Sequence, residues 1–173
     1  MYKRQWYQWP FDIRNVWYYG NYSADSEGHI RTISVLGNPL FFWACVPATV
    51  YAFVRVVKRH SRTALICVIG FLSAYLPWVL VPRCTFIYHY FTAVPFILIA
   101  FLIAYQRLEK TASLRRVVFT KGAVTLTVGR ILLLACVLVH ILMFIAFYPV
   151  LTGTLTTQNY ANALEWLPSW FFI

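Results

Sequence analysis

Four long apolar runs dominate this sequence and restrict the folds open to it. Each run has about the 20 residues that an α-helix needs to cross the ~30 Å hydrocarbon core of a bilayer. Hydrophobic residues make up 61% of the chain and the mean hydropathy is +0.64, which excludes a water-soluble globule. We therefore predict an all-α membrane protein with a four-helix transmembrane domain over residues 34–150. The predicted spans cover about 38–57, 63–81, 86–105 and 131–150.

Positive charge is distributed unevenly between these runs. Ten of the 15 Lys and Arg residues follow the first or the third run, whereas the turn between the second and third runs holds only Arg83. Because cytoplasmic loops are enriched in Lys and Arg, we expect both basic segments in the cytoplasm and both termini on the extracytoplasmic side. The net charge of +10 then reflects topology, and no nucleic-acid partner is expected.

Aromatic residues crowd the two ends of the chain. Residues 1–33 form a predicted extracytoplasmic aromatic loop segment, and residues 151–173 form a predicted extracytoplasmic interfacial tail. Trp and Tyr are favoured at the membrane interface, where their apolar rings and polar tips are both satisfied. For the first segment two structures fit equally well. It either lies flat in the interface or forms a small folded loop that packs on the bundle.

The sequence lacks the motifs of several common functional sites. The four cysteines have no CxxC spacing and three lie inside apolar runs, so we expect small buried hydrophobes and no metal site. No carboxylate lies inside any span, which argues against a small proton-coupled exporter. No Gly-rich phosphate loop and no Ser-His-Asp pattern is present. No cofactor is predicted.

The turn between the second and third spans is rich in polar side chains. Arg83 stands at its start, and a helix beginning near Cys84 would place four polar residues at positions i, i+3, i+4 and i+7 of one face. Such donors beside a fixed cation suit an anionic lipid phosphate and a polar sugar. An arginine reaching for headgroups and aromatic anchors at a helix end would give the same pattern. The four residues are Thr85, Tyr88, His89 and Thr92.

The remaining titratable residues offer few catalytic candidates. The carboxylates expected on the extracytoplasmic side are Asp12, Asp25, Glu27 and Glu165, which makes them the local candidates for a general base. Each is expected in a solvated loop. His140 lies deep in the fourth span, where a charged imidazole is costly, so we expect it to be neutral and bonded to a neighbouring helix.

The order of short motifs along the chain resembles a known family, the protein O-mannosyltransferases, and in particular the carboxyl-terminal four-transmembrane portion of the bacterial type. Thr92 departs from the family pattern, because proline is expected at that position. The matching motifs are residues 6–10, 12–14, 17–19, 36–39 with Trp43, Arg83 with 86–91, 94–96, 148–150 and 167–170.

The resemblance implies part of a GT-C type glycosyltransferase in a bacterial cell membrane. Such enzymes transfer mannose from a polyprenyl-phosphate donor (dolichyl phosphate in eukaryotes) to Ser or Thr hydroxyls of secreted proteins. The implied partners are therefore polyprenyl-phosphate-mannose and an acceptor protein, in addition to membrane lipids. On this basis the residues predicted to hold the lipid phosphate and sugar are Arg83, Tyr88 and His89. Those predicted to pack the external loop over the site are Trp6, Trp9 and Arg14.

The catalytic acids of the family lie in its first external loop, near the amino terminus of a much longer chain. No segment of this sequence corresponds to that loop, so catalytic residues stay unassigned here. We expect the chain to be inactive without the missing N-terminal catalytic half, either as a fragment or as a separate subunit. The rival hypothesis is a non-catalytic four-helix membrane scaffold, or interaction subunit, whose aromatic ends bind a partner.

Overall fold

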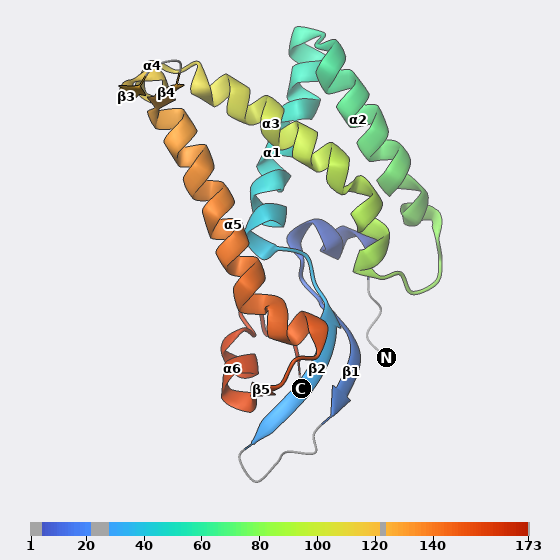
Figure 1. Cartoon of the computed structure of the whole chain (residues 1–173). Helices are drawn as coiled ribbons and strands as arrows, with labels where there is room; N and C mark the ends of the chain where they lie inside the picture. The colour runs from blue at the N-terminus through green and yellow to red at the C-terminus, as the bar shows by residue number, and fades with distance from the viewer. Residues whose placement is uncertain (1–4, 22–27, 122–123, 173) are drawn as a thin grey trace.

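Four long helical stretches form the body of the molecule (Figure 1). The computed structural model describes residues 5–21, 28–121 and 124–172. Each stretch is long and apolar enough to cross a membrane, which confirms the predicted all-α, multi-pass membrane architecture. The four stretches are Pro39–Arg59, Arg62–Leu80, Ile87–Glu109 and Val128–Thr152.

Two of the four stretches combine an α-helix with a 3-10 helix. The second stretch tightens into 3-10 helix η2, and the third begins as 3-10 helix η3, so this tighter geometry lies on both sides of the turn that holds Arg83. Pro77 and Pro95 lie at the two changes of helix type, where a missing backbone donor is tolerated. The bounds are α1 Pro39–Arg59, α2 Arg62–Tyr75, η2 Leu76–Leu80, η3 Ile87–Ala93, α3 Val94–Glu109 and α5 Val128–Thr152.

The start of α1 follows its sequence signals. The Asn38 side chain accepts a hydrogen bond from the Phe41 amide over 3.3 Å, and Pro39 occupies the first turn, where its missing N–H costs nothing. The Asn38 amide also donates to the backbone carbonyl of His140 on α5, 3.2 Å away. One side chain therefore caps α1 and links it to α5.

The helices α1, α2 and α3 pack closely on one another, whereas α5 stands apart (Figure 1). Small side chains allow this close packing, since Ala52, Cys67 and Ala100 are buried together between the three helices. α5 contacts β2 (His29–Val35) near one end and α4 near the other, and it touches α3 only lightly. Most of its side chains are exposed, as suits a helix that faces lipid or a further helix.

A small folded layer covers the end of the bundle where the described chain begins and ends (Figure 1). We call it the external layer, because it lies outside the helical bundle. Its sheet has the order β1-β2-β5, with both pairs antiparallel. Of the two alternatives for the first segment, the folded loop is therefore the one observed over the described residues. The elements of the layer are the 3-10 helix η1 (Trp6–Phe11), β1 (Val16–Asn21), β2, β5 (Thr156–Thr157) and α6 (Gln158–Ala163).

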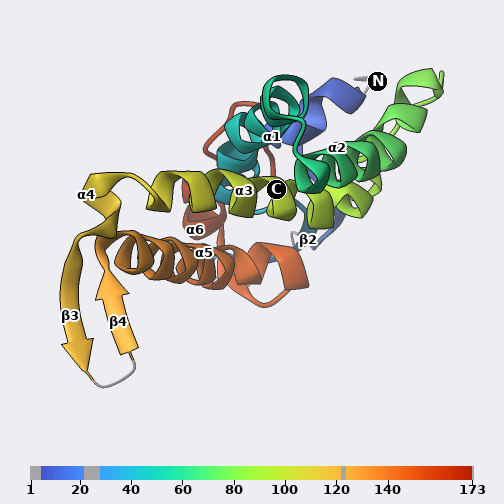
Figure 2. The same ribbon diagram turned by 90° about the horizontal axis from the view of Figure 1, so that it is seen from above.

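A β-hairpin lies at the opposite end of the bundle (Figure 1) and projects beyond α4 and α5 (Figure 2). It consists of β3 (Val117–Lys121) and β4 (Val124–Thr127), and it follows the short helix α4 (Ala112–Arg115). This segment is the basic linker between the third and fourth spans. Near it the Arg130 guanidinium lies 3.9 Å from the Glu109 carboxylate, both side chains being partly exposed.

The carboxyl-terminal tail folds back onto the first segment and binds it through polar contacts. The Trp170 indole donates to the Asp12 carbonyl oxygen over 2.7 Å, and the Ser169 hydroxyl donates to the carbonyl oxygen of Ile13. The Asn15 carboxamide accepts from the Phe171 amide over 3.3 Å. Residues from the two ends of the sequence thus form one structural unit.

Candidate functional site

The polar turn after the second span does not form the single helical face that the sequence predicts. The chain from Val81 to Phe86 is not helical, and η3 begins only at Ile87 with three residues per turn. Thr85 is consequently buried at 3% exposure, while the Thr92 hydroxyl bonds to the His89 carbonyl over 2.8 Å. Thr85 therefore does not lie on the predicted polar face, and the Thr92 hydroxyl is bonded to the backbone of its own helix.

The imidazole of His89 is enclosed by aromatic rings from two neighbouring elements. It stacks on Trp78 of η2 with ring centroids 3.9 Å apart and an interplanar angle of 26°. The Tyr88 ring lies 4.4 Å away on its own helix, and the Trp9 ring lies 6.1 Å away on η1. Because three elements contribute rings, the orientation of His89 is fixed by packing.

Arg83 and Tyr88 remain open to the surroundings beside this stack. Arg83 is exposed in the turn, close enough to His89 for its positive charge to act on the ring. Tyr88 is exposed at 39%. We call the group of Trp9, Trp78, Arg83, Tyr88 and His89 the Arg83 corner. It presents a guanidinium, a phenol and a packed imidazole within one short stretch.

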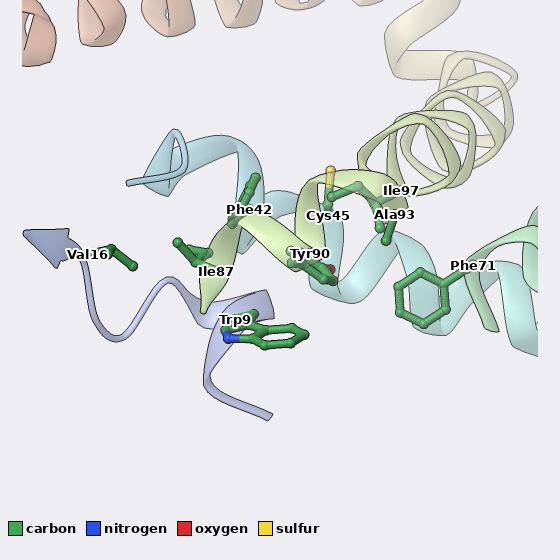
Figure 3. Packing of buried hydrophobic residues seen from close by; sticks show 9 residues of the cluster. All are labelled: Trp9, Val16, Phe42, Cys45, Phe71, Ile87, Tyr90, Ala93 and Ile97. Carbon is green, nitrogen blue, oxygen red and sulfur yellow. The ribbon is translucent and has the colours of Figure 1, made fainter. Parts of the chain in front are cut away.

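Trp9 of η1 packs into the buried cluster near Tyr90 of η3 (Figure 3) and so connects the external layer to this corner. Its ring is buried at 3% exposure and packs edge to face near Tyr75 and Trp78, at 6.3 and 6.4 Å between centroids. Within the described chain its indole N–H finds no acceptor. Trp6 is half-buried beside it, and its carbonyl accepts a hydrogen bond from the Tyr75 hydroxyl over 3.0 Å.

Arg14 lies half-buried between η1 and β1. The six predicted site residues therefore divide into two groups by position. Five lie on or beside the η1, η2 and η3 elements, and Arg14 belongs to the stretch that the C-terminal tail covers. Sequence reasoning missed Trp78 and Tyr75, although an aromatic residue at the end of the second apolar run was the available signal.

The carboxylates expected in solvated loops include one that is fully buried. Asp12 has 0% exposure, and one of its carboxylate oxygens accepts from the Gly37 amide over 3.4 Å while the other has no partner among the described residues. Burial raises the pKa of Asp12 to about 8, against the smaller lowering effect of the Gly37 bond. The expectation of a solvated Asp12 is thus wrong, because the tail covers it.

Glu165 is also poorly placed for catalysis. Glu165 is half-buried and accepts from the Phe172 amide over 2.8 Å, so its role here is to hold the tail. Asp25 and Glu27 lie outside the described residues. Among the described residues, no group of three or more potential ligands gathers to hold a metal ion.

His140 bonds within its own helix instead of to a neighbouring one. Its Nδ1 lies 2.6 Å from the Cys136 carbonyl oxygen, and its ring meets Phe41 edge to face at 5.9 Å. It lines an apolar cavity of about 570 Å³ between α5 and the α1–α3 pair. Its lining residues come from α1, α3 and α5 and the residue before α1, and none of them belongs to the Arg83 corner.

Comparison with known proteins agrees with this architecture. The family described as the C-terminal four TMM region of protein-O-mannosyltransferase matches residues 1–170. The chain belongs to this family. The protein O-mannosyltransferase match therefore includes the external layer and the tail as well as the four helices.

Curated relatives carry the same family name. The polyprenol-phosphate-mannose–protein mannosyltransferase of Corynebacterium glutamicum is 27% identical over 166 residues, and that of Mycobacterium tuberculosis is 25% identical over 167 residues. Each match covers 94% of this chain and 31% of the relative, so the chain spans about a third of the length of these mannosyltransferases.

A solved structure shows the same fold. The Saccharomyces cerevisiae protein O-mannosyltransferase Pmt1–Pmt2 complex, bound to the sugar donor, superposes with a TM-score of 0.72 at 21% sequence identity. The match covers 99% of this chain and 24% of that one. The external layer, the four spans and the tail thus fall within the region that matches a protein O-mannosyltransferase of known structure.

Proposed function

We propose that this chain forms the carboxyl-terminal, membrane-embedded part of an enzyme that transfers mannose from a polyprenyl-phosphate donor to Ser or Thr hydroxyls of secreted proteins. Family membership and the names of the curated relatives support this activity. The observation that carries the proposal for this chain is the Arg83 corner, where an exposed guanidinium stands beside a ring stack that three elements hold in place.

In this proposal Arg83 binds the donor phosphate and the neighbouring rings frame the sugar. A guanidinium offers a planar fork of donors that matches a phosphate oxygen pair, and it keeps its charge at any physiological pH. Tyr88 offers an exposed hydroxyl, and His89 offers a ring nitrogen in a fixed orientation. Trp6, Trp9 and the stretch containing Arg14 hold the external layer against the corner.

The carboxylates for proton transfer come, in this proposal, from the remaining two thirds of the protein. An acceptor hydroxyl needs a general base within hydrogen-bond reach. Asp12 is buried beneath the tail and Glu165 is bonded to a tail amide, so neither is available among the described residues. The chain then contributes donor binding and the floor of the site, and it requires the N-terminal half for turnover.

The proposal also fixes the orientation in a bacterial cell membrane. The Arg83 corner, the external layer and the tail lie at one end of the bundle, and the basic segments lie at the other (Figure 1). The charge distribution supports a cytoplasmic position for the basic end. Both termini and the donor phosphate would then face the extracytoplasmic side.

Replacing Arg83 tests this assignment. In the complete protein, Arg83→Ala should weaken binding of polyprenyl-phosphate-mannose at least about tenfold, because charge-assisted hydrogen bonds to the phosphate are lost, while binding of uncharged polyprenol stays unchanged. Arg31→Ala is the matched control, since Arg31 is an exposed cation on β2 at the same end. If Arg83→Ala bound polyprenyl-phosphate-mannose as tightly as the wild type does, Arg83 would not bind the donor. That result would favour the non-catalytic scaffold.

A further inference from the structure

A small polar pocket opens at the end of the bundle opposite the Arg83 corner. It has a volume of about 150 Å³, well above the roughly 30 Å³ that one water molecule occupies in the liquid. Three elements meet there, namely the last turns of α1 and α3 and the first turn of α2. Its polar lining residues are Arg55, Ser61, Thr63, Gln106, Arg107 and Lys110.

The pocket concentrates positive charge without a matching carboxylate. Arg55, Arg107 and Lys110 all line it, and none of its lining residues is acidic. The nearby Glu109 carboxylate lies 3.9 Å from the Arg130 guanidinium and lines a different cavity, which Lys110 also borders. Three cations with no carboxylate among them repel one another, which an anion in the pocket would relieve.

Arg55 is the side chain that points most directly to a ligand. Its Nε is buried, and within the described chain it has no hydrogen-bond partner. A buried charged donor without a partner is costly, and structures normally satisfy such groups with protein atoms, water or an ion. Arg55 lies in α1 four residues before its end, so it projects into the pocket from a regular helix.

The first turn of α2 adds further donors. α2 has 14 residues, and its first-turn amides carry the positive end of the helix dipole. The Ser61 hydroxyl oxygen accepts from the Ala64 amide over 3.4 Å, and this bond does not use its O–H donor. The Thr63 hydroxyl and the Gln106 carboxamide remain as neutral hydrogen-bonding groups at the pocket wall. Cations, hydroxyl and amide together match the oxygens of a phosphate group.

We propose that this pocket binds the phosphate of an anionic phospholipid from the leaflet on the basic side. The pocket lies where three membrane-crossing helices end, so a headgroup enters it while its acyl chains stay in the bilayer. A soluble phosphate shares the same chemistry and is the alternative source of the anion. The inference is independent of donor binding, because it concerns the other end of the molecule.

Lipid retention by the purified protein tests this site. The full-length protein in neutral detergent is titrated with phosphatidylglycerol, with phosphatidylcholine or with inorganic phosphate, and native mass spectrometry counts the bound molecules. We expect phosphatidylglycerol to bind at least about tenfold more tightly than phosphatidylcholine, and Arg55→Gln combined with Arg107→Gln to abolish this preference. Competition by inorganic phosphate at equal concentration would identify a free phosphate site and overturn the lipid assignment.

A matched double variant separates the pocket from general surface charge. Arg59→Gln combined with Arg62→Gln removes two cations from exposed positions of the same turn, outside the pocket. This control should retain the phosphatidylglycerol preference within about twofold. Equal loss in both double variants would overturn the proposal, since diffuse charge would then explain the binding. Arg55→Lys, which keeps the charge and fold but not the Nε donor, should bind with intermediate affinity.

Discussion

Trp170 donates its indole N–H to the backbone carbonyl of Asp12 over 2.7 Å, across 158 positions of sequence. The two residues are both buried, at 2% and 0% exposure. The sequence suggests that the tail lies in the membrane interface. In the structure the tail instead packs on a turn of the first segment, and the Asp12 side chain in that turn is buried. Burial raises the pKa of Asp12, and the Trp170 contact lies at the same turn of the chain.

Trp170→Phe should destabilise the external layer. The substitution keeps most of the ring but leaves the Asp12 carbonyl buried without its donor, at a cost of about 1–3 kcal/mol. Thermal unfolding of the protein in detergent measures the loss. Trp166→Phe is the control, because Trp166 is exposed at 44% and the same change should lower the unfolding temperature much less. Similar losses from both variants would contradict a specific role for the indole N–H.

Asp12 should make stability depend on pH. Its pKa rises from 3.8 to about 8 on folding, so the folded state keeps its proton where the unfolded state releases it. The free energy of unfolding should then fall as pH rises from about 4 to about 8, by at most about 1.4 kcal/mol per pH unit. Asp12→Asn should remove this slope and be the more stable form at pH 8. Parallel unfolding curves for wild type and variant between pH 5 and pH 8 would contradict it.

Gly70→Ala should loosen the contact between α2 and α3. A Cβ at this position would lie 2.1 Å from the Phe96 ring, so the ring or the helix must move. Overpacking costs about 1–3 kcal/mol, which outweighs the gain of about 1 kcal/mol in helix propensity. The unfolding temperature in detergent should fall. Ser73→Ala, at an exposed position of the same helix, should leave it nearly unchanged.

Asn38 should stabilise the protein through two separable hydrogen bonds. Asn38→Ala removes the α1 cap and the bond to the His140 carbonyl, whereas Asn38→Ser keeps a capping hydroxyl and removes only the link to α5. We expect a loss of about 1–2 kcal/mol for alanine and a smaller loss for serine. Thermal unfolding distinguishes them. If both variants lost the same stability, only the bond to the His140 carbonyl would contribute. If Asn38→Ser lost none, that bond would contribute nothing and the cap alone would stabilise the protein.

The helical part of the fold could be predicted because bilayer thickness sets the length of an apolar span. The Asn38 and Pro39 signals also specify where α1 begins, and the structure confirms them. The turn at Arg83 was less predictable. Its residues suit an α-helix, but the chain stays non-helical to Phe86 and then adopts 3-10 geometry. This geometry buries Thr85, and the Thr92 hydroxyl bonds to the His89 carbonyl.

The sequence allowed a folded first segment, but the strands of the external layer escaped prediction for a different reason. Strand β2 buries alternate residues, but two of the three buried side chains are Thr32 and Ser34, so no hydrophobic period of two marks the strand. These side chains are satisfied by distant partners, as when the Ser34 hydroxyl accepts from Asn15 over 3.3 Å. Contacts of this kind join residues far apart in sequence, and a local pattern carries no trace of them. The bond between Trp170 and the Asp12 carbonyl joins distant residues in the same way.

The return of residues 165–172 onto Asp12, Ile13 and Asn15 sets an order of assembly for biosynthesis. These closing residues follow all four spans along the polypeptide, so a ribosome delivers them after the helices. The contacts between the tail and the first segment can therefore form only after α5 has been synthesised.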